Sequence, residues 1–358
     1  MANLDDFAAI KALDQENVLG SIEQVGLQCQ QAWEDIARIE FPRSYYKAQN
    51  IVFAGMGGSS LGAYVIKSLF FDSLTLPFEI VNGYHLPPYV NENTLVIICS
   101  YSGTTEEAIC AAREAVTKKS LLTGIAVGKE LGSVLLGAKV PCYIFTPTYN
   151  PSNQPRLGTG YTAYSQFAIL SKLGFISVTN ADTKDVVAIA ETGIKKYGLV
   201  VPIASNPAKQ QALAWFEKIP VIVSAEFLAQ VGRVIRNQFN ECAKSFAAYH
   251  DIPELNHHLM EALTYPKSNQ DLLTFFMLNS SLYSPSIQKR YAITKEVIQK
   301  QGMKVSEFMP QSKTRISQAF ECIQFGAYVN YYMSMLYDVN PSKIPWVDYF
   351  KEQLAKTS

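Results

Sequence analysis

Two short polar turns each follow a run of apolar residues, and both contain residue types that can bind an oxyanion. The first is Gly55-Met-Gly-Gly-Ser-Ser-Leu-Gly-Ala63, which comes directly after the β-branched run Asn50–Ala54. Consecutive glycines let the backbone approach an anion, and the amides that begin the next helix can then bind it. The second is Ser100-Tyr-Ser-Gly-Thr-Thr-Glu-Glu107, whose hydroxyl groups and amides can satisfy several phosphate oxygens at once.

Each turn also has another interpretation. The glycine turn suggests a nucleotide site, but it lacks the G-x-x-x-x-G-K-[ST] spacing of a P-loop, and Ser60 replaces the third glycine of G-x-G-x-x-G. The second turn alone fits an ordinary helix cap, with Glu106 and Glu107 well placed at the helix N-terminus. Because loops after neighbouring parallel strands meet at the carboxyl edge of the sheet, we expect both turns to face one anion.

The rest of the sequence predicts the elements that position these turns. Helical spacing over residues 5–40 predicts one or two leading helices. Buried strands are predicted at 94–99, 122–127, 140–145, 218–226 and 272–278, and helices at 106–116, 164–173, 288–300 and 319–336. Strands that are nearly all apolar and alternate with helices indicate parallel sheets covered on both faces. The fold class is therefore α/β, with two doubly wound domains, each a parallel sheet flanked by helices.

Bulk composition bounds the domain count and the partners. A chain of 358 residues is long enough for two cores, and a polar linker at Ser177–Thr183 predicts domains at 1–180 and 181–358. The 31 basic and 31 acidic side chains give no broad field that would favour nucleic acid or an anionic membrane. The six cysteines are scattered without metal or disulfide spacing, and the N-terminus lacks a signal-peptide layout, which predicts a cytoplasmic protein.

Taken together, GMGGSSLGA and SYSGTTEE resemble the SIS (sugar isomerase) fold, and specifically the bifunctional phosphoglucose/phosphomannose isomerases. Four further segments stand where that family has its Arg, Glu, His and Lys, and the resemblance covers nearly the whole chain. These segments are Pro155-Arg156, Asn240-Glu-Cys-Ala-Lys244, Pro253-Glu-Leu-Asn-His257 and Phe350-Lys-Glu-Gln-Leu354. The stretch Asp338–Pro345 looks longer here than the usual proline-containing segment before the lysine.

The resemblance implies a site for a sugar phosphate that uses no metal and no cofactor. Its phosphate would be held by the hydroxyl groups of the second turn, and its sugar would lie against the glycine turn. The phosphate-binding residues would be Ser100, Ser102 and Thr105, and the residues lining the sugar would be Gly57, Gly58 and Ser59. Family enzymes are homodimers in which a histidine reaches in from the partner subunit, which implies that part for His257.

The resemblance also implies catalytic roles. Glu241 would move a proton between C2 and C1, which a carboxylate can do if its pKa is raised toward neutrality. The alternative interpretation of Glu241 is a surface carboxylate on a helix that pairs with Lys244. Arg156 would stabilise the cis-enediolate, its alternative being a solvated loop arginine. His257 and Lys351 would open the sugar ring, and which is acid and which is base stays open.

The implied activity is aldose–ketose isomerisation between glucose 6-phosphate and fructose 6-phosphate. Mannose 6-phosphate is a further expected substrate, and whether it is accepted stays open at this point. The main alternative is a non-catalytic SIS sensor or regulator of sugar phosphates, which would need the phosphate turns but no base. An SIS aminotransferase module is a third interpretation, and it requires an attached domain that supplies ammonia.

Overall fold

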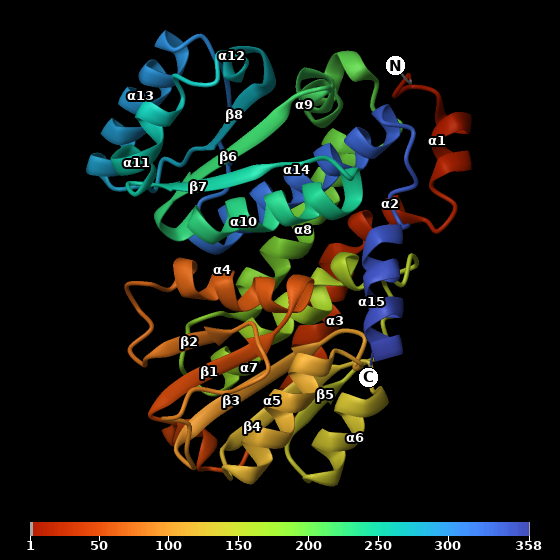
Figure 1. Cartoon of the computed structure of the whole chain (residues 1–358). Coiled ribbons are helices and arrows are strands. Elements are labelled where there is room, and N and C mark those ends of the chain that lie inside the picture. Colours follow the sequence, from red (N-terminus) through yellow and green to blue (C-terminus); the bar gives the residue numbers. More distant parts are fainter. Residues whose placement is uncertain (1–2, 358) are drawn as a thin grey trace.

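The computed structural model describes residues 3–357, in which two parallel β-sheets are each flanked by helices (Figure 1). The first sheet consists of β1 (Asn50–Gly55), β2 (Phe78–Val81), β3 (Thr94–Ser100), β4 (Leu121–Ala126) and β5 (Cys142–Ile144). The second consists of β6 (Ile219–Ala225), β7 (Ala248–Ile252), β8 (Leu273–Leu278) and β9 (Lys304–Phe308). The strand orders are β2-β1-β3-β4-β5 and β7-β6-β8-β9, and all neighbours are parallel.

The helices connect and cover these strands. The α-helices are α1 (Phe7–Leu13), α2 (Val18–Glu23), α3 (Val25–Ala37), α4 (Leu61–Leu69), α5 (Glu106–Thr117), α6 (Lys129–Gly137), α7 (Ser165–Lys172), α8 (Asn180–Tyr197), α9 (Pro207–Trp215), α10 (Ala229–Gln238), α11 (Leu255–Ala262), α12 (Asn269–Leu272), α13 (Pro285–Lys300), α14 (Arg315–Leu336) and α15 (Pro345–Thr357). The short 3-10 and π-helical turns are η1 (Tyr45–Lys47), η2 (Gly57–Ser60), η3 (Pro155–Leu157), η4 (Gly160–Tyr164), η5 (Ile203–Ser205), η6 (Glu226–Leu228) and η7 (Phe239–Ala243).

Side chains of the first sheet alternate between two apolar layers. Val52 and Val96 point to one face, where they pack in a cluster with Ala108 and Ala112 of α5. The next residues along these strands point to the opposite face, where Phe53 belongs to a much larger cluster that continues to the second sheet. The strands are apolar throughout because a parallel sheet is covered on both sides.

Helices from both halves lie between the two sheets, so the halves share one apolar core. In Figure 1 the first sheet lies below and the second above, with α4, α10 and α8 between them. α4 packs on α10, and α8 packs on both α3 and α14. This packing brings α10 against the helix that directly follows the glycine turn.

Several sequence expectations are corrected here. The leading region forms three helices rather than one or two, because the helical run is broken twice, at Asp14–Asn17 and at Gln24. The predicted linker is wrong in its second half, since Thr179 caps α8 through a capping box with Asp182 and the helix starts at Asn180. We propose 1–180 and 181–358 as domains because the strands of the first sheet all precede this point and the others follow it.

No helix within residues 3–357 has the length and apolarity that crossing a membrane requires.

Candidate active site

The glycine turn has a backbone that glycine alone adopts easily. Gly57 has a φ of +51°, and a Cβ there would meet no atom within 4 Å, so the requirement is conformational rather than steric. The next glycine packs against the chain, since a Cβ on Gly58 would lie 3.4 Å from the Cα of Arg156, which is an ordinary contact distance. The turn therefore lies directly against the segment that carries the predicted cation.

Ser59 joins the glycine turn to the second turn. Its Oγ accepts a hydrogen bond of 3.1 Å from the backbone amide of Tyr101. Gln166 donates to the Ser59 carbonyl oxygen at 3.0 Å, which fixes the other side of the residue. The two turns predicted from the sequence are thus neighbours at one sheet edge, as expected.

The hydroxyl groups of the second turn converge on one another. Ser100 Oγ lies 2.8 Å from Thr105 Oγ1 and 3.5 Å from Ser102 Oγ, and it accepts a hydrogen bond of 3.2 Å from the Gly103 amide. Thr105 is the N-cap residue of α5, yet its side chain makes no capping hydrogen bond. The ordinary helix-cap interpretation therefore fails for this side chain, and the amides at the start of α5 are left without it.

Arg156 is held between the two halves of the chain. It lies in η3, is only 5% exposed, and donates from Nη1 to Gln154 Oε1 at 3.2 Å. Its Nη2 donates to two backbone carbonyl oxygens, that of Pro341 at 2.8 Å and that of Ser342 at 2.5 Å. Carbonyl groups orient a guanidinium without neutralising its charge, so the side chain is a fixed cation and not a solvated loop arginine.

Glu241 lies in η7, the π-helical turn that follows α10, and it is partly buried. Burial raises its pKa above the usual value for a carboxyl group. The positive charges of Arg156, Lys351 and Lys244 act on Glu241 in the opposite sense and offset part of this rise in pKa. A carboxyl group with a raised pKa beside fixed cations has the properties expected of a general base.

Lys244 does not form the surface pair with Glu241 that was the alternative to a catalytic role. Its backbone is left-handed, with a φ of +51°, and its Nζ donates to the carbonyl oxygens of Asn340 at 2.5 Å and Cys242 at 3.1 Å. Burial lowers the pKa of Lys244 to about 8. The sequence motif contained this lysine, but nothing in its spacing indicated that it would reach the 340–342 segment.

The other two predicted residues lie in different places. Lys351 is on α15 and exposed, close enough for its charge to act on Glu241. His257 is on α11 and exposed. In Figure 1, α11 lies at the far left of the upper half and α15 at the right. One chain therefore brings Arg156, Glu241 and Lys351 together near the two turns and leaves His257 apart.

Sequence reasoning missed two side chains that support Arg156, which are those of Gln154 and Asn150. Asn150 donates from Nδ2 to the Tyr101 hydroxyl at 2.8 Å and to the Gln154 carbonyl oxygen at 3.0 Å. Asn150 therefore links Tyr101 of the second turn to Gln154, the residue that accepts a hydrogen bond from Arg156. Its only sequence signal is a loop rich in Asn, Pro and Gly, which is not specific.

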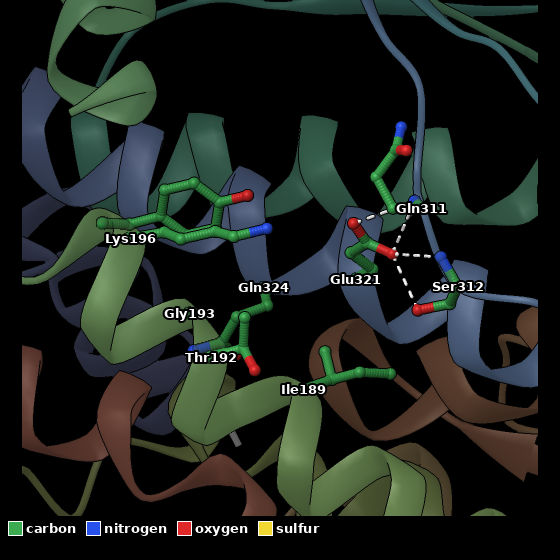
Figure 2. A pocket seen from close by; sticks show the side chains of 9 residues that line it. Ile189, Thr192, Gly193, Lys196, Gln311, Ser312, Glu321 and Gln324 are labelled. Atoms are coloured by element: carbon green, nitrogen blue, oxygen red, sulfur yellow. Dashed lines mark hydrogen bonds between the residues drawn. The ribbon is translucent and has the colours of Figure 1, made fainter. Parts of the chain in front are cut away.

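A separate pocket of about 210 Å³ opens between α8 and α14 (Figure 2). Glu321 lines this pocket, and its carboxylate accepts hydrogen bonds from the amides of Gln311 and Ser312 and from the Ser312 hydroxyl. None of the predicted site residues lines this pocket. Its carboxylate is already satisfied by the protein, so we assign it no catalytic part.

Comparisons with known proteins agree with the fold of both halves. Residues 44–144 match the SIS domain model, and residues 204–354 match the model of the bacterial phospho-glucose isomerase C-terminal SIS domain. The bifunctional phosphoglucose/phosphomannose isomerase of Caldicellulosiruptor bescii is 28% identical over 94% of this chain and 98% of its own. The enzyme of the same name from Aquifex aeolicus is 26% identical over 92% and 97%.

A solved structure of a hypothetical protein from Thermus thermophilus superposes with a TM-score of 0.74 at 14% identity, covering 98% of this chain and 94% of that one, which supports the fold. Both halves carry the SIS architecture, and the relatives align along almost the entire length. The chain belongs to the SIS-domain sugar isomerases, in the family of the bifunctional phosphoglucose/phosphomannose isomerases.

Proposed function

We propose that this protein is an aldose–ketose isomerase that interconverts glucose 6-phosphate and mannose 6-phosphate with fructose 6-phosphate. The observation that carries the proposal is the partly buried Glu241, whose pKa is raised by burial while the charge of Arg156 acts on it. A sensor of sugar phosphates needs the phosphate turns but has no use for a base beside a fixed cation. Relatives that carry the isomerase name over nearly the full chain support the same conclusion.

In this proposal the second turn binds the phosphate. The hydrogen bonds among the hydroxyls of Ser100, Ser102 and Thr105 would be exchanged for bonds to phosphate oxygens. The amides at the start of α5 add donors and a favourable dipole. Gly57, Gly58 and Ser59 would line the sugar, and the space beside Gly57, where a Cβ would meet no atom within 4 Å, leaves the turn open on that side.

The proton transfer assigned to Glu241 follows from its surroundings. The carboxylate removes the proton from C2 of the open-chain aldose, and the C1 carbonyl oxygen gains negative charge. The proton of the C2 hydroxyl then passes to the C1 oxygen while Glu241 returns its proton to C1, which leaves the carbonyl group at C2. Arg156 faces the charge of the enediolate, which exists only near the transition state, so its stabilisation lowers the barrier rather than the ground state. Because C2 becomes planar, glucose and mannose 6-phosphate share one intermediate.

Ring opening needs an acid at the ring oxygen and a base at the C1 hydroxyl, and we assign this pair to His257 and Lys351. Since His257 lies apart from Glu241 in one chain, we propose a homodimer in which it is supplied by the partner subunit. We further propose a cytoplasmic location, because all six cysteines are unpaired thiols, as a reducing compartment favours.

A coupled assay of fructose 6-phosphate conversion, run with and without EDTA, tests the base. We expect Glu241→Gln to lower kcat by about 10²–10⁴-fold while substrate binding persists. Glu261→Gln, an exposed carboxylate on α11, is the matched control and should keep wild-type activity. Tight binding of fructose 6-phosphate by a wild type that never turns it over would favour the sensor.

Mixing two inactive variants tests the shared site. If His257 acts in the partner's site, heterodimers of His257→Ala and Glu241→Gln contain one intact site each. Random mixing should then restore about a quarter of wild-type activity, because half of the dimers are mixed and half of their sites are intact. No recovery after mixing, with dimers still present by light scattering, would show that the histidine acts within its own chain.

A further inference from the structure

A second basic cluster lies between α10 and α4. Arg233 and Arg236 are three residues apart on α10, so both project from one side of the helix, and both are half-buried. The guanidinium carbon of Arg233 lies 3.8 Å from the centre of the Tyr64 ring on α4. Tyr249 of the edge strand β7 packs beside them, its ring 3.0 Å from where a Cβ on Gly232 would lie.

Neither guanidinium is neutralised by an acidic side chain, although that of Arg233 stacks on Tyr64. Among residues 3–357, no ion pair or hydrogen bond is made by either guanidinium, and the Nε of each is buried without a partner. The Tyr249 hydroxyl is likewise buried without a hydrogen bond of normal geometry. Burial and the positive charge of Arg233 both lower the pKa of Arg236, so two like charges share one poorly solvated place.

Native proteins rarely leave buried donors unfilled, and those that remain usually mark an ion or a water. Asp251 lies near enough to Tyr249 to raise the pKa of its hydroxyl, but it forms no ion pair with either arginine. The cluster therefore has two positive charges and three unfilled donors. A small anion with several oxygens matches all of them, because guanidinium groups present paired N–H donors.

We propose that Arg233, Arg236 and the Tyr249 hydroxyl form a second anion-binding site, for a phosphate group carried by a small metabolite. It differs in chemistry from the turn at Ser100–Thr105, which offers neutral hydroxyls and amides. None of that turn's hydroxyl groups bonds to either arginine.

The site is connected to the glycine turn by a short chain of contacts. The Tyr64 hydroxyl, under the Arg233 guanidinium, donates to Asn82 Oδ1. Asn82 in turn donates from Nδ2 to the Gly55 carbonyl oxygen at 2.6 Å, at the end of β1. An anion held by α10 would thus fix α4 and the start of the glycine turn. Its effect on turnover, which rests on the proposed isomerase function, would be regulatory.

Inorganic phosphate is the probe for the binding test, which does not depend on turnover. In a Ser102→Ala/Thr105→Ala background, which weakens the first site, we expect calorimetry to show remaining phosphate binding and phosphate to raise Tm. Adding Arg236→Gln should weaken that binding at least about tenfold, since it removes a charged donor pair. This variant keeps the Arg233–Tyr64 stack, and Arg290→Gln, an exposed arginine on α13, is the matched control.

Arg236→Lys, which retains the charge but not the paired N–H donors, should recover only part of the affinity and so separates the contribution of the charge from that of the donors. The proposal is wrong if the Ser102→Ala/Thr105→Ala variant binds no phosphate, or if Arg236→Gln binds it as well as its parent. A third result would also refute it: neither the parent variant nor its Arg236→Gln derivative binds phosphate, but Arg236→Gln changes the particle mass measured by light scattering. The arginines would then contact another chain instead of an anion. Loss of isomerase activity alone leaves the calorimetric result intact, so the two proposals fail separately.

Discussion

Replacing Gly103 by alanine tests whether the second turn is as tightly defined as its hydrogen bonds indicate. Gly103 has a φ of +69°, and its amide donates to Ser100 Oγ at 3.2 Å. A Cβ there would lie 2.1 Å from the carbonyl oxygen of Gly128, whereas ordinary contact begins near 3.4 Å. The obstacle is backbone, which cannot rotate away, so the turn or the loop after β4 must move by about 1 Å.

The cost can be estimated from these two features. A left-handed backbone costs an alanine about 1 kcal/mol, and forcing an extra methyl group into a packed site costs about 1–3 kcal/mol. We therefore expect Gly103→Ala to lower the free energy of unfolding by about 2–4 kcal/mol. A shift of about 1 Å in the phosphate-binding hydroxyls should also lower kcat/KM for fructose 6-phosphate by about 100-fold.

Urea denaturation followed by circular dichroism measures the first quantity, and the coupled isomerase assay the second. Gly137→Ala is the matched control, because Gly137 ends α6 and a Cβ there meets no atom within 4 Å. It should raise stability by about 0.5–1 kcal/mol and leave kcat/KM unchanged. If Gly103→Ala behaves like this control in both assays, the turn is softer than we infer and our account of phosphate binding is wrong.

Three further predictions concern charges. Burial raises the pKa of Glu241, so the folded protein is more stable while this carboxyl group is protonated and loses that stability as pH rises through the raised pKa. Glu241→Gln stays neutral at every pH. It should therefore resist urea better than wild type at pH 7 but not at pH 4. Removing the cation in Lys244→Met should raise the pKa of Glu241 further and move the acid limb of the kcat/KM profile to higher pH; an unmoved limb would contradict the coupling. Asp5→Asn removes the carboxylate that lies 2.8 Å from the fully buried Lys209, whose ammonium group then keeps the Leu199 carbonyl oxygen but has no ion-pair partner; it should cost about 3 kcal/mol in urea melts, whereas Asp6→Asn, which keeps a capping side chain, should cost little.

The central strands could be predicted from the sequence because burial on both faces makes them apolar throughout. Thr94–Ser100 and Ile219–Ala225 are such runs, and the turns after them follow from their composition. Three edge strands were missed for the same physical reason, whereas the edge strand β5 was predicted within residues 140–145. β2, β7 and β9 are only partly buried, so sequences such as Lys304–Phe308 mix polar and apolar residues without a clear period.

The site residues were predicted by resemblance, and their physical setting came only from the structure. A surface pair between Glu241 and Lys244 looked plausible because the residues are three apart on an expected helix. The helix ends in a π-turn and Lys244 adopts a left-handed backbone, which turns its ammonium group to the 340–342 segment. Contacts made by carbonyl groups far along the chain leave no trace in side-chain patterns.

The backbone hydrogen bonds that fix Arg156 have a consequence for which sequence changes this chain can tolerate. Its terminal nitrogen bonds to the carbonyl oxygens of Pro341 and Ser342, and Lys244 bonds to that of Asn340, so the loop acts through groups that every residue possesses. A deep mutational scan should find positions 341 and 342 tolerant of many replacements but intolerant of single-residue insertions or deletions. In such a segment, the backbone conformation can be retained while the amino acids change, so sequence identity does not reflect how important the segment is.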